Sequence, residues 1–213
     1  MSENLLKCLT KAPVVPLVQS NDAAEAVAIS QALLDGGLQV LEVVLRTDAA
    51  FDCLGAICDT YPDVQVGAGT VLSGKQAEKA IANGAKFIVS PGLHESVVKV
   101  AQNNDIPVLP GIATATELQQ AWNIGLRTVK FFPAGLSGGP KMLKALSSVF
   151  RDVTFMPTGG VNPDNLKEIL EIPAVIACGG SWLTPRAAIE NRDLNIIKNL
   201  AREALEIASG KAS

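Results

Sequence analysis

The sequence predicts an α/β fold and, within that class, a single (β/α)8 TIM barrel with an additional N-terminal helix. Runs rich in β-branched residues alternate eight times with runs rich in Ala, Leu, Glu and Lys along 213 residues. No linker or shift in composition divides the chain, so we expect one domain spanning residues 1–213. A doubly wound open sheet is the alternative, but it usually needs fewer strands, and no GxGxxG motif follows the first predicted strand.

Each predicted strand is followed by a predicted helix. Segment 1–11 mixes charged residues with leucines and is expected to form a short amphipathic helix. Strands are expected at 14–18, 39–46, 64–71, 86–90, 107–111, 128–133, 154–158 and 175–179. Helices are expected at 23–34, 49–59, 75–83, 95–103, 116–123, 140–147, 163–170 and 194–208, with a short one after the last strand.

Composition excludes several classes of protein. Hydrophobic residues make up 48% of the chain, net charge is -3, and no basic stripe suggests a nucleic-acid partner. No apolar run approaches the roughly 18 residues that a membrane span needs, and the N-terminus does not resemble a signal peptide. The four cysteines form no CxxC pair and are expected to be reduced, buried thiols of a cytoplasmic protein: Cys8, Cys53, Cys58 and Cys178.

The second predicted strand carries two charged residues on one face. Because strand side chains alternate, Glu42 and Arg46 point to one side and the apolar residues Leu41, Val43 and Leu45 to the other. The apolar side is expected to contact the helices, which puts Glu42 deep in the barrel and Arg46 at its mouth. Buried charge is costly unless it is paired or used. Both residues are therefore candidates for chemistry, with a structural ion pair as the alternative.

The sixth predicted strand buries a lysine among apolar residues. Burial of Lys130 disfavours its ammonium form, and the neutral amine is the form that attacks a ketone to make a Schiff base. An ordinary lysine is almost wholly protonated at neutral pH, so burial matters. The carboxyl group of Glu42, at similar depth, could shuttle protons for that reaction. A lysine reaching solvent from a strand edge is the alternative, although an interior barrel strand has no edge.

Glycine-rich turns follow the seventh and eighth predicted strands. Small residues let backbone N–H groups approach an anion, and the loops after these two strands are the recurrent phosphate site of the barrel fold. The candidate residues are Thr158, Gly159, Gly160, Gly180 and Ser181, with ordinary tight turns as the alternative.

Other residues at strand ends are less specific. Thr70 could hydrogen-bond a substrate carboxylate beside Arg46, and Pro91 lies in the turn after the fourth strand. The alternative is that both residues only form ordinary turns. His94 is the only histidine, so it cannot build a site with several histidine ligands, and we expect a surface or capping role. Trp122 and Trp182 are expected to serve packing.

Together these motifs closely resemble the 2-keto-3-deoxy-6-phosphogluconate (KDPG) aldolases, which also act as 4-hydroxy-2-oxoglutarate (KHG) aldolases. Any one motif is unspecific, but the set is highly specific and runs in order through nearly the whole chain. The matching segments are 13–16, 41–47, 66–72, 90–92, 110–111, 130–134, 157–160 and 179–182.

The resemblance implies a metal-independent, cofactor-free class I aldolase of the Entner–Doudoroff pathway that forms homotrimers. It implies that Lys130 forms the imine and Glu42 shuttles protons. The substrate would be a phosphorylated keto acid, cleaved to pyruvate and glyceraldehyde 3-phosphate. The resemblance also implies the remaining substrate contacts: Arg46 and Thr70 for the pyruvyl carboxylate, Pro91 and Phe132 for the pocket wall, Thr158 for the substrate, and Gly159, Gly160, Gly180 and Ser181 for the phosphate.

One loop departs from the family pattern. Residues 135–140 read Gly-Leu-Ser-Gly-Gly-Pro, where the family more often has an acidic residue near the start and no proline. This departure concerns substrate preference more than chemistry. Galactonate-type relatives usually carry an arginine in the first strand, and segment 14–18 has none, which favours the gluconate type.

Two other hypotheses stay open at this point. An isomerase or synthase on a phosphate-binding barrel would use a carboxylate base and no imine, and a metal-dependent aldolase is a variant of it. A non-catalytic sugar-phosphate-binding protein would explain the glycine turns, but not two buried cations and an acid in one barrel.

Overall fold

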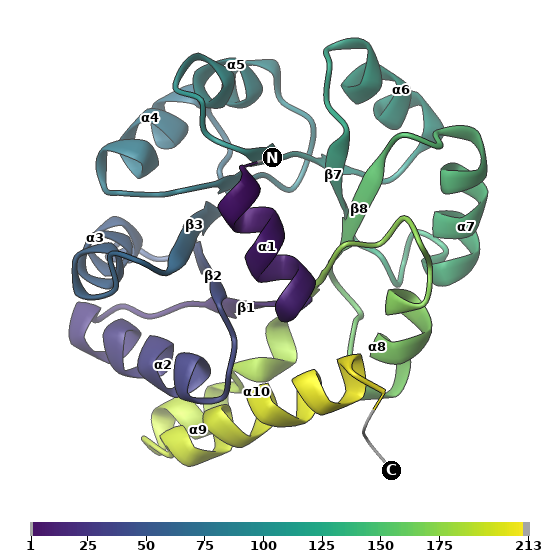
Figure 1. Ribbon diagram of the computed structural model, residues 1–213. Helices are drawn as coiled ribbons and strands as arrows, with labels where there is room; N and C mark the ends of the chain where they lie inside the picture. Colours follow the sequence, from purple (N-terminus) through teal and green to yellow (C-terminus); the bar gives the residue numbers. More distant parts are fainter. Residues whose placement is uncertain (1, 211–213) are drawn as a thin grey trace.

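The computed structural model describes residues 2–210, in which strands gather at the centre and helices surround them (Figure 1). All strand pairings between named strands are parallel, which confirms the predicted α/β class. The predicted domain also includes Met1 and residues 211–213, which lie outside the described residues.

The strands form a curled, barrel-like arrangement. Six pair in the order β5-β4-β3-β2-β1-β9 and three in the order β6-β7-β8. Isolated bridges join Phe155 to Val175 and Thr158 to Gly179. The strands are β1 (Val14–Val18), β2 (Val40–Val44), β3 (Gln65–Gly69), β4 (Ile88–Val89), β5 (Val108–Leu109), β6 (Gly111–Ile112), β7 (Thr128–Phe131), β8 (Thr154–Pro157) and β9 (Cys178–Gly180).

Most predicted strands extend beyond the observed ones, and the strand predicted at 175–179 is observed at Cys178–Gly180. Two of the differences have a local cause. The strand predicted at 107–111 is two short strands, β5 and β6, on either side of Pro110, because proline has no N–H to continue the ladder. The carbonyl of Pro110 still accepts a hydrogen bond from the Lys130 amide, at 2.9 Å. The strand predicted at 39–46 ends at Val44, because the chain turns there and the Arg46 amide donates to the Val44 carbonyl at 2.8 Å.

The helices lie outside the strands, apart from α1, which crosses the centre (Figure 1). Predicted helices 95–103, 163–170 and 194–208 have the observed bounds, and the others agree within two residues. The helices are α1 (Glu3–Lys11), α2 (Ala23–Asp35), α3 (Ala50–Thr60), α4 (Gly74–Ala82), α5 (Glu95–Asn103), α6 (Ala115–Asn123), α7 (Gly139–Val149), α8 (Pro163–Leu170), the 3₁₀ turn η1 (Ser181–Leu183), α9 (Arg186–Glu190) and α10 (Leu194–Ala208).

Helix α1 covers the N-terminal end of the strands. Its buried residues Leu5 and Leu9 pack in one apolar cluster with inward-facing residues of the strands, among them Val40 and Met156. A larger cluster fills the layer between strands and outer helices and includes Leu41. Since α1 covers one end, substrate access is left to the C-terminal ends of the strands, where α/β barrels place their chemistry.

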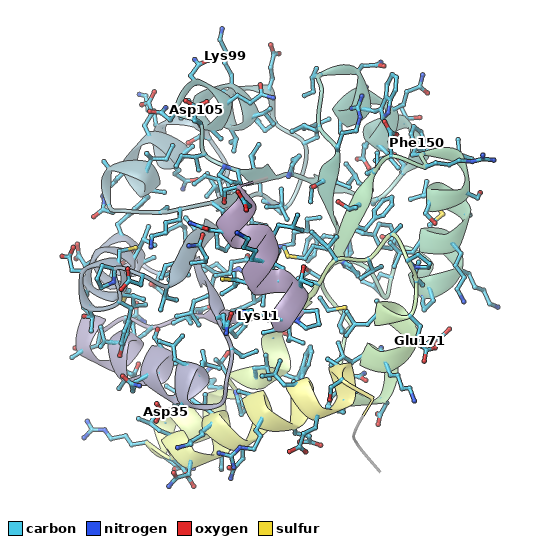
Figure 2. All side chains as sticks on the ribbon, viewed as in Figure 1. Lys11, Asp35, Lys99, Asp105, Phe150 and Glu171 are labelled. Carbon is cyan, nitrogen blue, oxygen red and sulfur yellow. The ribbon has the colours of Figure 1, made fainter. Side chains whose placement is uncertain are left out.

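Charged side chains project from the rim of the molecule. Figure 2 shows Asp35 and Lys99 on the outer helices α2 and α5 and Glu171 directly after α8, and all three are exposed. No helix within residues 2–210 has the length and apolar character needed to cross a membrane.

The cysteines are free thiols, as predicted, but not all are buried. Cys53 and Cys178 are buried, whereas Cys8 and Cys58 are half-buried, so the prediction of burial is wrong for these two. Cys8 lies on α1 and Cys58 on α3, and a surface helix covers only one of its faces. Burial nevertheless raises the pKa of Cys58 to about 11.

Candidate active site

Two charged side chains from different sheets meet inside the curled sheet. Lys130 on β7 and Glu42 on β2 are 2% and 0% exposed, and the Lys130 Nζ lies 3.7 Å from the Glu42 Oε1. That distance is too long for a hydrogen bond. Among the described residues, neither carboxylate oxygen of Glu42 has a hydrogen-bond partner. The structure thus brings an amine and an acid together in an apolar interior, where each changes the reactivity of the other.

Strand alternation explains why these two side chains point inward. On β7, Val129 and Phe131 on either side of Lys130 belong to the apolar layer beneath the helices. On β2, Leu41 and Val43 flank Glu42 and join the same layer. The lysine and the acid are therefore left on the inner face, as the sequence pattern predicts.

The Lys130 amine has an aromatic neighbour, and its strand pairs with a glycine. The Lys130 Nζ lies 5.1 Å from the centroid of the Phe132 ring. Gly111 is the register partner of Lys130 on β6, and a Cβ atom at Gly111 would lie 2.0 Å from the Pro91 carbonyl oxygen. Of the two sequence-predicted wall residues, Phe132 thus lies beside the Lys130 amine, and Pro91 lies against Gly111 on the neighbouring strand.

Arg46 and Thr70 form a second pair nearer the mouth. The Arg46 Nε donates to the Thr70 Oγ1 at 3.0 Å. Thr70 follows β3 and has a left-handed backbone, with φ of 58°, which is uncommon for a β-branched residue and costs energy. Arg46 also lines a cavity of about 590 Å³, together with Leu17, Val44 and Ser181. Leu17 is the register partner of Glu42, so the two residues lie side by side on neighbouring strands.

The two glycine turns lie next to each other. The bridge between Thr158 and Gly179 aligns the ends of β8 and β9. Gly159 and Gly160 both have φ of 86°, a left-handed conformation that glycine adopts without strain. Within residues 2–210, neither of their amides donates a backbone hydrogen bond. Adjacent amides in such a turn can bind an anion.

Gly180 and Ser181 complete this end of the site. Gly180 ends β9, and Ser181, which is exposed, begins the η1 turn. A Cβ atom at Gly180 would lie 2.7 Å from the Trp182 ring, so this glycine also makes room for the tryptophan. Trp182 packs against the large apolar cluster, in line with its predicted packing role.

A match to one family spans nearly the whole chain. The family model described as "Aldolase: KDPG and KHG aldolase" matches residues 5–200.

The chain belongs to the KDPG and KHG aldolase family.

Curated members of the KDPG and KHG aldolase family are similar over most of their length. The chain is 45% identical to the KHG/KDPG aldolase of Escherichia coli strain K12 over 198 residues, which cover 93% of each protein. It is 44% identical to the 2-dehydro-3-deoxy-phosphogluconate aldolase of Dickeya dadantii over 92% of each.

Solved structures of KDPG aldolases share the fold. The KDPG aldolase of Legionella pneumophila, with pyruvate captured as a covalent carbinolamine intermediate, has a TM-score of 0.91 and 38% identity, covering 96% of this chain and 98% of that one. The KDPG aldolase of Zymomonas mobilis ZM4 with 3-phosphoglycerate has a TM-score of 0.89 and 40% identity, covering 97% of each chain. A chain of a designed protein cage made by fusing symmetric oligomeric domains has a TM-score of 0.85 and 30% identity, covering 95% of this chain and 74% of that one.

Sequence reasoning did not single out the other residues around Arg46. The cavity beside Arg46 is also lined by Ser20, Thr184, Arg186 and Glu190, which come from loops and from α9. A hydrogen bond to Glu190 raises the pKa of Arg186. Of the residues that line this cavity, Leu17 could have been found from the sequence, as an inward-facing position on the first strand. Ser20, Thr184, Arg186 and Glu190 are ordinary polar residues in the sequence.

His94 lies at the surface of the molecule. It is exposed at the start of α5, where its ring accepts a hydrogen bond from the Ser96 amide, which confirms the predicted capping role. Over the described part of the chain, no three His, Cys, Asp or Glu side chains are grouped to hold a metal ion.

Proposed function

We propose that this family member is a class I aldolase acting through a Schiff base on Lys130. It cleaves KDPG to pyruvate and glyceraldehyde 3-phosphate, and 4-hydroxy-2-oxoglutarate to pyruvate and glyoxylate. The observation that carries the proposal is the buried pair of Lys130 and Glu42, 3.7 Å apart. The names of the relatives support the substrates, and the carbinolamine in the Legionella structure supports the covalent chemistry.

The reaction begins when the neutral amine of Lys130 attacks the C2 ketone of the substrate. Glu42, beside the amine, carries protons to and from the carbinolamine so that water leaves and a protonated imine forms. A base then removes the C4 hydroxyl proton and the C3–C4 bond breaks. Its electrons enter the iminium to give an enamine, and the aldehyde departs. Protonation at C3 and hydrolysis release pyruvate and restore the lysine.

The remaining residues hold the two anionic ends of the substrate. Arg46, oriented by its hydrogen bond to Thr70, binds the carboxylate next to the reacting ketone. Pro91 and Phe132 form the wall beside the amine. The phosphate lies at the other end of the substrate, on the two adjacent turns, where it contacts Gly159, Gly160, Gly180 and Ser181. Thr158 makes a further contact with the substrate.

We also propose that β5 and β6 act as one strand and that the eight resulting strands close into a single barrel domain over residues 1–213. The two bridges between the β8 and β9 segments support closure. We propose a homotrimer in addition, which the symmetric oligomeric domains of the designed cage support in part. Sedimentation equilibrium should give three times the chain mass of 22.2 kDa. The cytoplasmic location stays a prediction.

Borohydride trapping tests the proposed function. Reduction in the presence of pyruvate should add one reduced pyruvyl group at Lys130, located by peptide mass spectrometry, and should abolish cleavage. Lys130→Ala is the control and should be inactive and unlabelled at that position. Activity that survives in Lys130→Ala would instead support an isomerase or synthase with a carboxylate base. Product binding without turnover would support a sugar-phosphate-binding protein, and loss of activity in EDTA would support a metal-dependent aldolase.

A further inference from the structure

Three side-chain oxygens in the described residues are buried without a hydrogen-bond partner. They are the two carboxylate oxygens of Glu42 and the Oγ1 of Thr158. Both residues are more than nine-tenths buried, at 0% and 3% exposure. Buried polar atoms normally have partners, and exceptions in native proteins often serve function. These oxygens are therefore candidates for contact with a substrate.

Each of these side chains lies directly against a glycine. A Cβ atom added to Gly69 would stand 2.0 Å from the Glu42 Oε1, and one added to Gly179 would stand 2.2 Å from the Thr158 Oγ1. Real Cβ atoms essentially never approach closer than 3.0 Å. The polar side chains thus occupy the space that any other residue at these two positions would need.

Backbone conformation does not explain these glycines. Neither Gly69 nor Gly179 has a left-handed φ, so the backbone accepts an alanine at both positions. At Gly69 the three nearest atoms to an added Cβ all belong to Glu42. What these positions require is space, and the groups that fill the space belong to the proposed site.

The direction of the Glu42 side chain strengthens the argument. The register partner of Glu42 on β3 is Gly67, yet the carboxylate lies against Gly69, two residues nearer the C-terminal end of the strand. A Cβ atom at Gly67 would meet the Phe87 ring at 2.4 Å instead. The carboxylate therefore leans toward the open end of the strands, with Oε1 3.7 Å from the Lys130 amine.

We propose that Gly69 and Gly179 are positioning residues, because their missing side chains form two notches that aim the Glu42 carboxylate and the Thr158 hydroxyl at the substrate. This inference rests on the proposed function. An alanine at position 69 must move the carboxylate by at least about 1 Å, since the Cβ contact has to open from 2.0 Å to 3.0 Å. A displacement of about 1 Å can reduce turnover roughly 100-fold.

The first experiment compares Gly69→Ala with Gly67→Ala. Both variants place a methyl group on β3 against a buried side chain, but only the first touches the acid. In Gly69→Ala, kcat should fall roughly 100-fold with KM little changed. Exchange of the pyruvate methyl protons with D2O, which needs a base beside the imine, should fall in parallel. Gly67→Ala should lower thermal stability and keep most of both rates.

The second experiment repeats Gly69→Ala in a Glu42→Ala background. If the notch serves the carboxylate, the substitution lowers Tm in the wild type and leaves Tm unchanged once the carboxylate is gone. The same comparison applies to Gly179→Ala in the wild type and in Thr158→Ala. If Gly69→Ala does not fold in the wild type, its effect on Tm can still be measured in the Glu42→Ala background. The comparison therefore tests the inference whether or not the single variant folds.

The results that overturn the inference differ from those that overturn the proposed function. Gly69→Ala with wild-type kcat and exchange, or an equal loss of Tm in both backgrounds, would show that the glycine serves only the sheet. A wild-type protein that gives no adduct at Lys130 with borohydride and pyruvate would remove the proposed function itself. The Tm comparison between backgrounds would still report whether the notch houses the carboxylate.

Discussion

Replacing both members of the Glu42–Lys130 pair with methionine should make the protein more stable while abolishing turnover. As an ion pair, charges 3.7 Å apart attract by about 4.5 kcal/mol at an effective dielectric constant of about 20. Taking the two ions out of water costs several kcal/mol each. No hydrogen bond joins the pair, and the acid has no other hydrogen-bond partner within residues 2–210. The balance is unfavourable, so Glu42→Met/Lys130→Met should gain about 1–4 kcal/mol.

Urea unfolding at pH 7, followed by tryptophan fluorescence, measures this gain. The unfolding slope m should not change, and Tm should rise by about 2–4 °C per kcal/mol for a chain of this size. Each single variant leaves one polar partner buried alone and should be less stable than the wild type by about 3–5 kcal/mol. Leu109→Met, in the inner apolar cluster, controls for methionine packing and should cost less than about 1.5 kcal/mol. A double variant less stable than wild type, with the same m, would refute the reasoning.

Three further predictions concern single residues. Arg46→Ala should lower kcat/KM roughly 10- to 100-fold through loss of a charge-assisted hydrogen bond to the substrate carboxylate, measured by coupled pyruvate assay; an unchanged value would remove Arg46 from the site. At pH 8, Cys58 should react with Ellman's reagent roughly 100-fold more slowly than a thiol of pKa 9.0, since burial raises its pKa to about 11, and the reaction rate should increase with pH. Rapid labelling of Cys58 at pH 8, located by peptide mass spectrometry, would contradict this. Hydrogen bonds lower the pKa of Glu117, and the largest effect comes from the Ala113 amide. The ionised carboxylate therefore stabilises the fold fully above the ordinary carboxyl pKa range, and this stabilisation is lost as the pH falls through the lowered pKa. Glu117→Ala should therefore cost about 1 kcal/mol in urea unfolding at pH 7, and the cost should shrink as the pH is lowered below the ordinary carboxyl range. A cost that does not change with pH counts against the capping box.

Helix bounds were predictable wherever a local signal was strong. The predicted limits of α8 and α5 agree with the structure because Asn162 and His94 cap them through contacts within a few residues. The prediction of one strand at 107–111 was wrong because it overlooked a local signal, the proline in the middle of the segment. Apolar composition suggested one strand, but Pro110 lacks the N–H that the ladder requires.

The chain's own pattern determined the class of fold and the direction of the important side chains. A period of two residues puts Glu42 and Lys130 on the face opposite their apolar neighbours, and this holds for any strand whose other face is covered by helices.

Only the tertiary structure decided how far apart those side chains lie and what surrounds them. The 3.7 Å separation, the hydrogen bond between Arg46 and Thr70, and the glycine notch beside Glu42 all involve residues on different strands or in the loops that follow them. Periodicity gives the direction of a side chain within one strand. Distances between strands depend on register, twist and curvature, which arise when the whole sheet packs against its helices.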